Sequence, residues 1–424
     1  MDISIHNGHL VDPANGVNQV TDIHISRNRI KAIGDPHQDF RPKRVIDAKG
    51  RYIFPGIVDL CARLREPGEE HKATILSETR AAASAGITSL ICPPDTLPVI
   101  ETPGMVHMIQ ERANAAGFSG IYPLGALTAG LKGKKLTDMA TLQDAGCVGV
   151  SNALEPVENS LLMRRAMQYA STYDIPVFLA SWDPWLQGNG VVHEGFISTQ
   201  LGLPAIPEAA ETVGVARDIA LVETSGASAH IYLVSCARSV SRLREARQRN
   251  LPITGSVAVH NLLCTESDIG EFNTFFKVIP PLRTIRDQEG LIQGLASGDI
   301  SVICSDHQPH SLDSKLAPFS EAATGIAGLD TLLTMAWSLV KNNQLEVQTV
   351  ISALTANPAQ IVGLECGNLA VGRPADLLMF DDRIIWTLDD TTMMSKGRNS
   401  PWFGHELTGK VVLTIKNGKI VWEI

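Results

Sequence analysis

The sequence lacks the features that mark several common protein classes. None of its apolar runs approaches the roughly 18 residues that a membrane-spanning helix requires. The N-terminus alternates between apolar and polar residues without a basic leading region, which predicts that no signal peptide is present. Its seven cysteines are scattered and follow no C-x-x-C spacing, which indicates reduced, buried thiols and not a disulfide framework. We therefore expect a cytoplasmic protein that does not insert into a membrane.

Positive charge is also scarce. Lysine and arginine number 36 against 45 aspartates and glutamates, so the formal net charge is -9. This balance disfavours nucleic acid and anionic membrane surfaces as partners. The composition, with 44% hydrophobic and 19% charged residues, is that of an ordinary globular protein. The length of 424 residues allows one large α/β domain with a smaller one, or two to three ordinary domains.

The two ends of the chain share one pattern. Residues 1–54 and residues 366–424 both read as short alternating strands separated by turns such as Asn7-Gly8 and Asn417-Gly418. Because chain termini often lie close together, we predict that both ends form one small β-rich, sandwich-like domain.

The middle of the chain, residues 55–365, has a different pattern of hydrophobic residues. Eight short, mostly apolar runs alternate with helix-like segments, which predicts a parallel sheet covered by helices. Eight such units indicate a (β/α)₈ TIM barrel; an open doubly wound sheet is the alternative, although no G-x-G-x-x-G follows the first strand. The runs are Ile57–Leu64, Thr88–Pro93, Gly120–Leu127, Val148–Ala153, Pro176–Ser181, His230–Cys236, Ile253–Val259 and Ser301–Asp306.

In such barrels the reacting groups lie at the carboxyl ends of the strands. Cys61 and Arg63 are two residues apart on the first strand, so both should face one pocket. Asp306, His307 and His310 follow the last strand within five residues. An aspartate there suits a metal ligand or a general base, and the alternative is a hydrogen-bonded loop that caps the barrel.

These features resemble the dihydroorotase family of the amidohydrolase superfamily over nearly the whole chain. The matching stretches are Pro55–Asp59 with Leu64–Gly68, Lys277–Arg283, Ser305–His310, Gly325–Leu329, Asn357–Ala359 and Ala375–Leu377. The resemblance implies a (β/α)₈ barrel with a β-rich domain built from both termini. It also implies the reversible closure of N-carbamoyl-aspartate to dihydroorotate in pyrimidine synthesis, with one or two zinc ions.

Most of the metal-ligand positions that the resemblance implies do not carry the family's ligands, and only the strand-8 aspartate remains. The first-strand histidine pair falls on Cys61 and Arg63, and the metal-bridging position of the fourth strand falls on or beside Asn152. The histidine positions of the fifth and sixth strands fall on Ala180 and Leu233. The asparagine that holds the substrate falls on Asp95, whereas Arg65, His310 and the strand-8 aspartate, Asp306, remain.

Zinc needs three or four nitrogen, sulfur or oxygen donors in tight geometry, which alanine and leucine do not supply. Arg63 would also place a fixed positive charge at the metal position. At about 4 Å and an effective dielectric near 20, repulsion between two unit charges costs about 4 kcal/mol, and a divalent ion roughly doubles it. We therefore expect no zinc, a vestigial Asp306 without catalytic function, and a substrate-like pocket of Arg65, Asp95 and His310.

Three functions follow from these observations. The resemblance extends to the non-catalytic dihydroorotase-like chains of bacterial aspartate transcarbamoylase complexes. It implies a partner role with the transcarbamoylase catalytic chain in a hetero-oligomer as large as a dodecamer, with a homodimer when alone. The alternative is an active zinc-dependent dihydroorotase or related cyclic amidohydrolase with a rearranged metal site. A third is a metal-free sensor that binds a carboxylated pyrimidine through Arg65.

Overall fold

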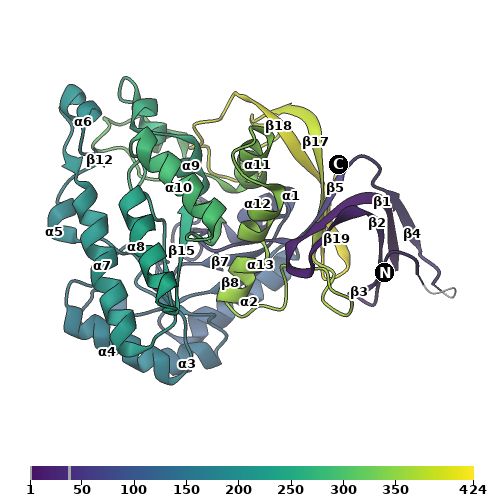
Figure 1. Cartoon of the computed structure of the whole chain (residues 1–424), viewed down its shortest axis with the longest axis horizontal. Helices are drawn as coiled ribbons and strands as arrows, with labels where there is room; N and C mark the ends of the chain where they lie inside the picture. Colours follow the sequence, from purple (N-terminus) through teal and green to yellow (C-terminus); the bar gives the residue numbers. More distant parts are fainter. Residues whose placement is uncertain (1, 37–39) are drawn as a thin grey trace.

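The computed structural model describes residues 2–36 and 40–424 and shows a β-rich part beside a larger part built of strands and helices (Figure 1). Both ends of the chain contribute to one eight-stranded sheet in the order β19-β18-β17-β5-β1-β2-β3, with β4 paired to β1. The bounds are β1 (Ile3–Asp12), β2 (Val17–Ser26), β3 (Arg29–Ile33), β4 (Arg44–Asp47), β5 (Tyr52–Pro55), β17 (Leu377–Thr387), β18 (Glu406–Lys416) and β19 (Lys419–Glu423).

The two ends meet where β17 runs antiparallel to β5, with Leu377 opposite Pro55 and Phe380 opposite Tyr52. The sheet has a hydrophobic core of its own, in which Ile3 and Ile5 of β1 and Ile53 of β5 are fully buried. The predicted pairing of the two ends is therefore present in the structure, whereas the division of the chain near residues 54 and 366 stays a prediction.

Each of the eight predicted apolar runs overlaps at least one strand, and most of these strands are shorter than the runs. Their bounds are β6 (Ile57–Asp59), β7 (Ile87–Cys92), β8 (Gly120–Pro123), β9 (Gly125–Ala126), β10 (Val150–Ser151), β11 (Val177–Leu179), β14 (Ala229–Ile231), β15 (Ile253–Ala258) and β16 (Val302–Cys304). The third run supplies both β8 and β9. Where these nine strands pair with one another, the pairing is parallel.

The parallel strands form two arcs, β6-β7-β8 and β16-β15-β14-β11-β10-β9. A single residue, Leu124, joins β8 to β9, and at the other side a single bridge pairs Ala62 with His307. Within residues 40–424, strand pairing alone therefore gives two linked arcs and not one closed sheet. The carboxyl ends of β6 and β16 are nevertheless held together, which positions the residues that follow them.

Helices follow most of the strands and cover their outer faces (Figure 1). They are α1 (Ile75–Ser84), α2 (Pro103–Ala116), α3 (Met139–Asp144), α4 (Ser160–Thr172), α7 (Glu208–Ser225), α8 (Ala237–Gln248), α9 (Val259–Leu263), α10 (Ile285–Ser297), α11 (Leu332–Lys341), α12 (Val347–Leu354) and α13 (Ala356–Ile361). An insertion between β11 and α7 holds α5 (Pro184–Gln187), β12 (Val192–His193), α6 (Phe196–Leu201) and β13 (Ala205–Ile206). No helix of the described part is long and apolar enough to cross a membrane.

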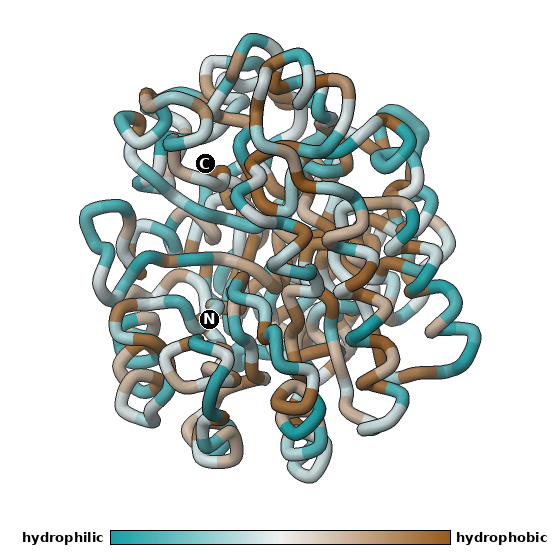
Figure 2. Tube along the Cα trace, turned by 90° about the vertical axis from the view of Figure 1, so that its left-hand side faces the viewer, coloured by the Kyte–Doolittle hydropathy of each residue, from teal (hydrophilic) through white to brown (hydrophobic). Residues whose placement is uncertain are grey.

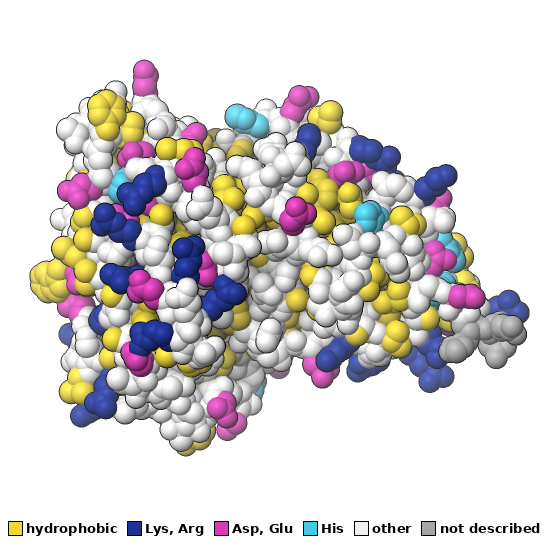
Figure 3. Space-filling model, in the orientation of Figure 1, with side chains coloured by type: hydrophobic (Ala, Val, Ile, Leu, Met, Phe, Trp, Pro, Cys, Tyr) yellow, Lys and Arg dark blue, Asp and Glu magenta, His cyan; other side chains and the backbone are white. Residues whose placement is uncertain are grey.

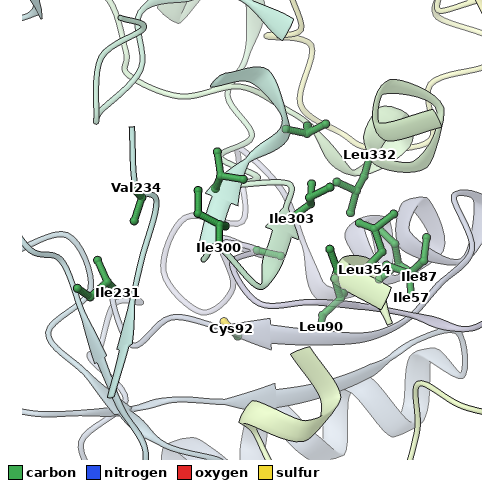
Figure 4. Close-up of a cluster of buried hydrophobic side chains, with 14 of the residues drawn as sticks. Ile57, Ile87, Leu90, Cys92, Ile231, Val234, Ile300, Ile303, Leu332 and Leu354 are labelled. Carbon is green, nitrogen blue, oxygen red and sulfur yellow. The ribbon is translucent and has the colours of Figure 1, made fainter. Parts of the chain in front are cut away.

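Strand alternation sorts neighbouring residues into two cores. Ile57, Ile231 and Ile303 face the helices in the large outer cluster, part of which Figure 4 shows. Their neighbours Val58 and Tyr232 belong to an inner cluster enclosed by the strands. This division arises because successive side chains of a strand point to opposite faces of the sheet. Figure 2 shows hydrophobic segments running through the interior. All seven cysteines are buried and free.

Candidate functional site

Three strand ends bring four of the predicted residues together. Cys61 and Arg63 follow β6, Asp95 follows β7 and Asp306 follows β16. Backbone hydrogen bonds hold the first and last of these segments side by side: Arg63 N donates to His307 O at 2.9 Å, and His307 N donates to Cys61 O at 3.1 Å. Arg63 is 5% exposed and Asp306 1% exposed, whereas Asp95 is half-buried at 28%, so the cluster meets solvent on the Asp95 side.

Arg63 links two carboxylates at the centre of this cluster. Its Nη1 donates to Asp306 Oδ1 at 3.3 Å, and its Nε donates to Asp95 Oδ2 at 2.7 Å. Gln308 Nε2 lies 3.1 Å from both oxygens of Asp306, and the Cys61 thiol lies 3.6 Å from Oδ1. The Asp306 carboxylate is thus enclosed by donors from this chain.

Burial controls the protonation of the cluster. It raises the pKa of Asp306 to about 6, against the opposing effects of Arg63 and the Gln308 amide. Burial, followed by the Asp306 carboxylate, raises the pKa of the Cys61 thiol well above its usual value. Metal ligation and nucleophilic attack both need a thiolate, so Cys61 is a poor ligand and a poor nucleophile at neutral pH.

Arg65 and His310 form a second group beside the first. Arg65 donates through Nη2 to His310 Nε2 at 3.0 Å, through Nη1 to Glu69 at 3.1 Å and through Nε to Pro309 O at 3.3 Å. Burial, aided by Arg65, lowers the pKa of His310 to about 3, which keeps the imidazole neutral. The Arg65 guanidinium is therefore already occupied by groups of its own chain.

The remaining ligand positions do not join the cluster through any polar contact. The Asn152 amide is fully used elsewhere, because Oδ1 accepts from Thr128 at 2.6 Å and Nδ2 donates to the carbonyl oxygens of Leu131 and Glu155. Ala180 and Leu233 are buried and carry no donor atom in their side chains. The polar site therefore contains only the residues from the first, second and eighth strand ends.

These residues do not fit a zinc ion. Among the residues that the structure describes, no group of three or more His, Cys, Asp and Glu side chains is arranged to hold a metal. Next to Asp306, the first-strand position holds the Arg63 guanidinium, which is always charged and cannot ligate. His307 is committed too: Nε2 lies 2.8 Å from Glu78, and Nδ1 accepts from the Gly328 amide.

Unusual backbone geometry persists at the strand ends. Ala153, Leu233 and Asp306 have φ values of 52°, 53° and 43°, in the left-handed region that residues other than glycine rarely adopt. Each such residue costs roughly 1–2 kcal/mol and persists where the surrounding structure determines it. The fold thus imposes this backbone conformation at three strand ends, although the side chains of Ala153 and Leu233 offer no ligand atom.

Sequence reasoning missed two residues of the site. Gln308 lies in the strand-8 cluster and donates to Asp306, and its place between His307 and Pro309 could have revealed it. Glu78 lies on α1 and accepts from Ser395 Oγ at 2.6 Å and from Lys396 N at 3.0 Å, as well as lying beside His307. No sequence spacing connects Glu78 to partners more than 200 residues away.

Comparison with known proteins shows which family the chain resembles. Residues 50–239 match the dihydro-orotase-like family and residues 313–422 the amidohydrolase family. A dihydroorotase-like protein from Pseudomonas putida is 42% identical over 420 residues, which cover 99% of each chain. A dihydroorotase from Anaeromyxobacter dehalogenans is 41% identical over 421 residues, 99% of this chain and 97% of its own.

Solved structures share the fold. L-hydantoinase (dihydropyrimidinase) from Arthrobacter aurescens superposes with a TM-score of 0.89 at 22% identity, covering 100% of this chain and 96% of its own. D-hydantoinase from Thermus sp. gives a TM-score of 0.85 at 21% identity, covering 99% and 95%. This likeness implies the predicted (β/α)₈ barrel with a β-rich domain, which strand pairing alone leaves as two arcs.

Proposed function

Because this chain belongs to the dihydroorotase-like family of the amidohydrolases, we propose that it is an inactive member of that family. Its role is to assemble and stabilise an aspartate transcarbamoylase complex in pyrimidine biosynthesis. The observation that carries this proposal is the ion pair between Arg63 and Asp306, which sets a fixed cation against the aspartate that the family resemblance assigns to the metal.

The loss of chemistry follows from the contacts of Asp306. Its carboxylate accepts hydrogen bonds from Arg63 and Gln308, so it has no free oxygen aimed at a substrate. Bulk water has a pKa near 15.7, and no side chain in this cluster is placed to lower it. The site therefore lacks both an activated nucleophile and an available base.

A structural role is supported by what the family stretches do in this chain. Lys277 donates to the carbonyl oxygens of Ser320 and Ala322 at 2.9 and 2.8 Å, which ties down the loop after strand 8. Arg283 donates to Ser235 Oγ at 2.7 Å and pairs with Glu211. These contacts fix the loops at the carboxyl ends of the strands, which supports a role in which the shape of the chain is what matters.

The alternative function is an active zinc-dependent dihydroorotase, or a related cyclic amidohydrolase, with a rearranged metal site. Relatives that carry the name dihydroorotase at 41% identity favour it, as does the 3.6 Å separation of Cys61 and Asp306. Such a site would require Arg63 to leave its two carboxylates.

Metal content and turnover distinguish the two functions. We expect the purified chain to contain far less than one zinc per molecule by mass spectrometry after incubation with zinc, and to show no turnover of dihydroorotate or carbamoyl-aspartate. Cys61→Ala and Asp306→Asn should leave both values unchanged, because neither residue holds a metal. Stoichiometric zinc that Cys61→Ala removes, together with turnover, would establish the active enzyme instead.

Assembly is tested separately. We expect co-expression with an aspartate transcarbamoylase catalytic chain to give a complex much larger than either chain alone, up to a dodecamer, by gel filtration with light scattering. The chain alone should run as a smaller species such as a homodimer. If both chains elute independently at micromolar concentration, the partner role is wrong even when the chain proves inactive.

A further inference from the structure

A polar cleft of about 600 Å³ lies between the β-rich sheet and the end of helix α2. Its walls come from the β2–β3 hairpin, the β18–β19 hairpin and the segment from α2 into β8. None of its lining residues takes part in the cluster around Asp306. The cleft is therefore a separate feature that the proposed function does not use.

The two hairpins give the cleft a rigid wall. Arg27 and Asn28 have φ values of 50° and 67° at one turn, and Asn417 and Gly418 have values of 47° and 69° at the other. The turns touch, since a Cβ on Gly418 would lie only 2.5 Å from the Asn28 Cα atom. Asn417 N also donates to the Asp376 carboxylate at 2.6 Å. The backbone of both turns is thus held at a defined position.

The cleft is strongly positive in a chain whose net charge is -9. Four of its lining residues are cationic, namely Arg27, Arg29, Lys416 and Lys419, and no lining residue is acidic. Figure 3 shows lysine and arginine side chains gathered at the lower right of the molecule, below the position of β3. A concave surface with charge of one sign concentrates ligands of the opposite sign.

Little of this charge is neutralised. Lys416 pairs with Asp376 at 2.7 Å; burial lowers the pKa of this lysine, but Asp376 raises it more, so the group remains charged at 12% exposure. Arg29 donates to the Gly372 carbonyl oxygen at 2.7 Å, which carries no formal charge. Arg27 and Lys419 form no ion pair with any residue in the described part of the chain. Three cations are therefore available to an anion.

We propose that this cleft binds a small phosphorylated molecule that carries two or more negative charges. Arginine and lysine are the side chains that proteins use for phosphate groups, through charge-assisted hydrogen bonds. The aromatic rings of Phe118 and Tyr122 line the same cleft and offer a surface for an unsaturated ring of the ligand. A nucleoside polyphosphate combines both features at the size of this cleft.

Calorimetric titration of the full chain tests the proposal, with pyrophosphate and ATP as probes and adenosine as the uncharged control. We expect both anions to bind and adenosine to give no heat. Arg27→Gln with Lys419→Gln should weaken pyrophosphate binding by about tenfold or more, because two charge-assisted contacts are lost. The matched control is Arg165→Gln with Lys134→Gln, two exposed cations outside the cleft, which should bind as the unchanged chain does.

Three results would overturn the proposal. The first is that neither anion gives heat at about 5 mM, because the dissociation constant would then be too high for a specific binding site. The second is an equal loss of affinity in both double variants, which would show that only overall charge matters. The third is adenosine binding as tightly as ATP, which would mean that the phosphates are not recognised. None of these results depends on whether the chain turns over dihydroorotate or binds a transcarbamoylase.

Discussion

Replacing Arg63 with methionine is expected to lower the free energy of unfolding by about 3–5 kcal/mol near pH 8, and by clearly less near pH 5. The loss arises because Asp306 would be left as a buried carboxylate without its cation. Methionine has a similar stem length, so packing around the aliphatic part is largely kept. Urea unfolding at the two pH values measures the difference.

The pH dependence follows from the pKa of Asp306. Its folded-state pKa, about 6, lies above its ordinary value of 3.8, so the folded state holds this proton more tightly than the unfolded state. The stabilising effect of protonation is complete below the unfolded pKa and is lost as the pH rises through about 6. Arg63 offsets the cost of the ionised form, and its removal therefore matters most above this range.

Two controls define the cause. Arg249→Met removes an exposed cation that pairs with Glu223, and it should produce a small change without pH dependence in this range. Arg63→Met combined with Asp306→Asn removes both charges, and it should recover most of the lost stability. If the double variant is as unstable as Arg63→Met alone, lost packing and not the ion pair accounts for the effect.

Glu78→Ala is expected to destabilise the chain by about 3 kcal/mol or more. Glu78 is 0% exposed, and its carboxylate contacts His307 Nε2 at 2.8 Å and Ser395 Oγ at 2.6 Å. Alanine would leave a buried imidazole and a buried hydroxyl without these partners. Glu111→Ala, at an exposed position of α2, is the matched control and should have a much smaller effect. Thermal or urea unfolding makes this comparison.

The sign of the pH effect is opposite to that at Asp306. Burial raises the pKa of Glu78, but hydrogen bonds from His307 and Ser395 lower it more, to below its ordinary value of 4.5. Its contribution to stability is therefore present above the unfolded pKa and is lost as the pH falls through the lower folded value. The Glu78→Ala variant should accordingly approach the stability of the unchanged chain in acid. A deficit that stays constant down to acid would point to lost packing instead.

Much of the architecture could be predicted because it depends on local periodicity. The eight apolar runs overlap the strands of the two arcs, β6 to β11 and β14 to β16, but not the parallel pair β12 and β13. The segments Ala73–Ala85 and Pro103–Ala116 contain α1 and α2. The strand ends could not be placed so well. The run Ile57–Leu64 leaves regular pairing after Asp59, because Cys61 and Arg63 turn to bond with the backbone of His307. The insertion of α5, β12, α6 and β13 was missed because segments of two to six residues carry no measurable period.

The site could be predicted in part for a similar reason. Cys61, Arg63, Asp95 and Asp306 meet because parallel strands end at one edge, a property of topology that the sequence pattern reveals. Asn152 also follows a strand end, but its amide turns to the neighbouring loop carbonyl oxygens. That choice depends on side-chain geometry and on the left-handed residue Ala153 after it, neither of which a pattern of residue types reveals.

The sheet that joins β5 to β17 imposes an order on synthesis. The first strands leave the ribosome more than 300 residues before their partner, so β5 presents an unpaired edge while the whole barrel is being translated. Contacts between such distant residues form slowly, since the loop between them must close first. A chain truncated anywhere before Leu377 would keep that edge open permanently, exposed to pairing with other chains. The last 48 residues, from Leu377 onward, therefore cover the edge that the first strands leave open.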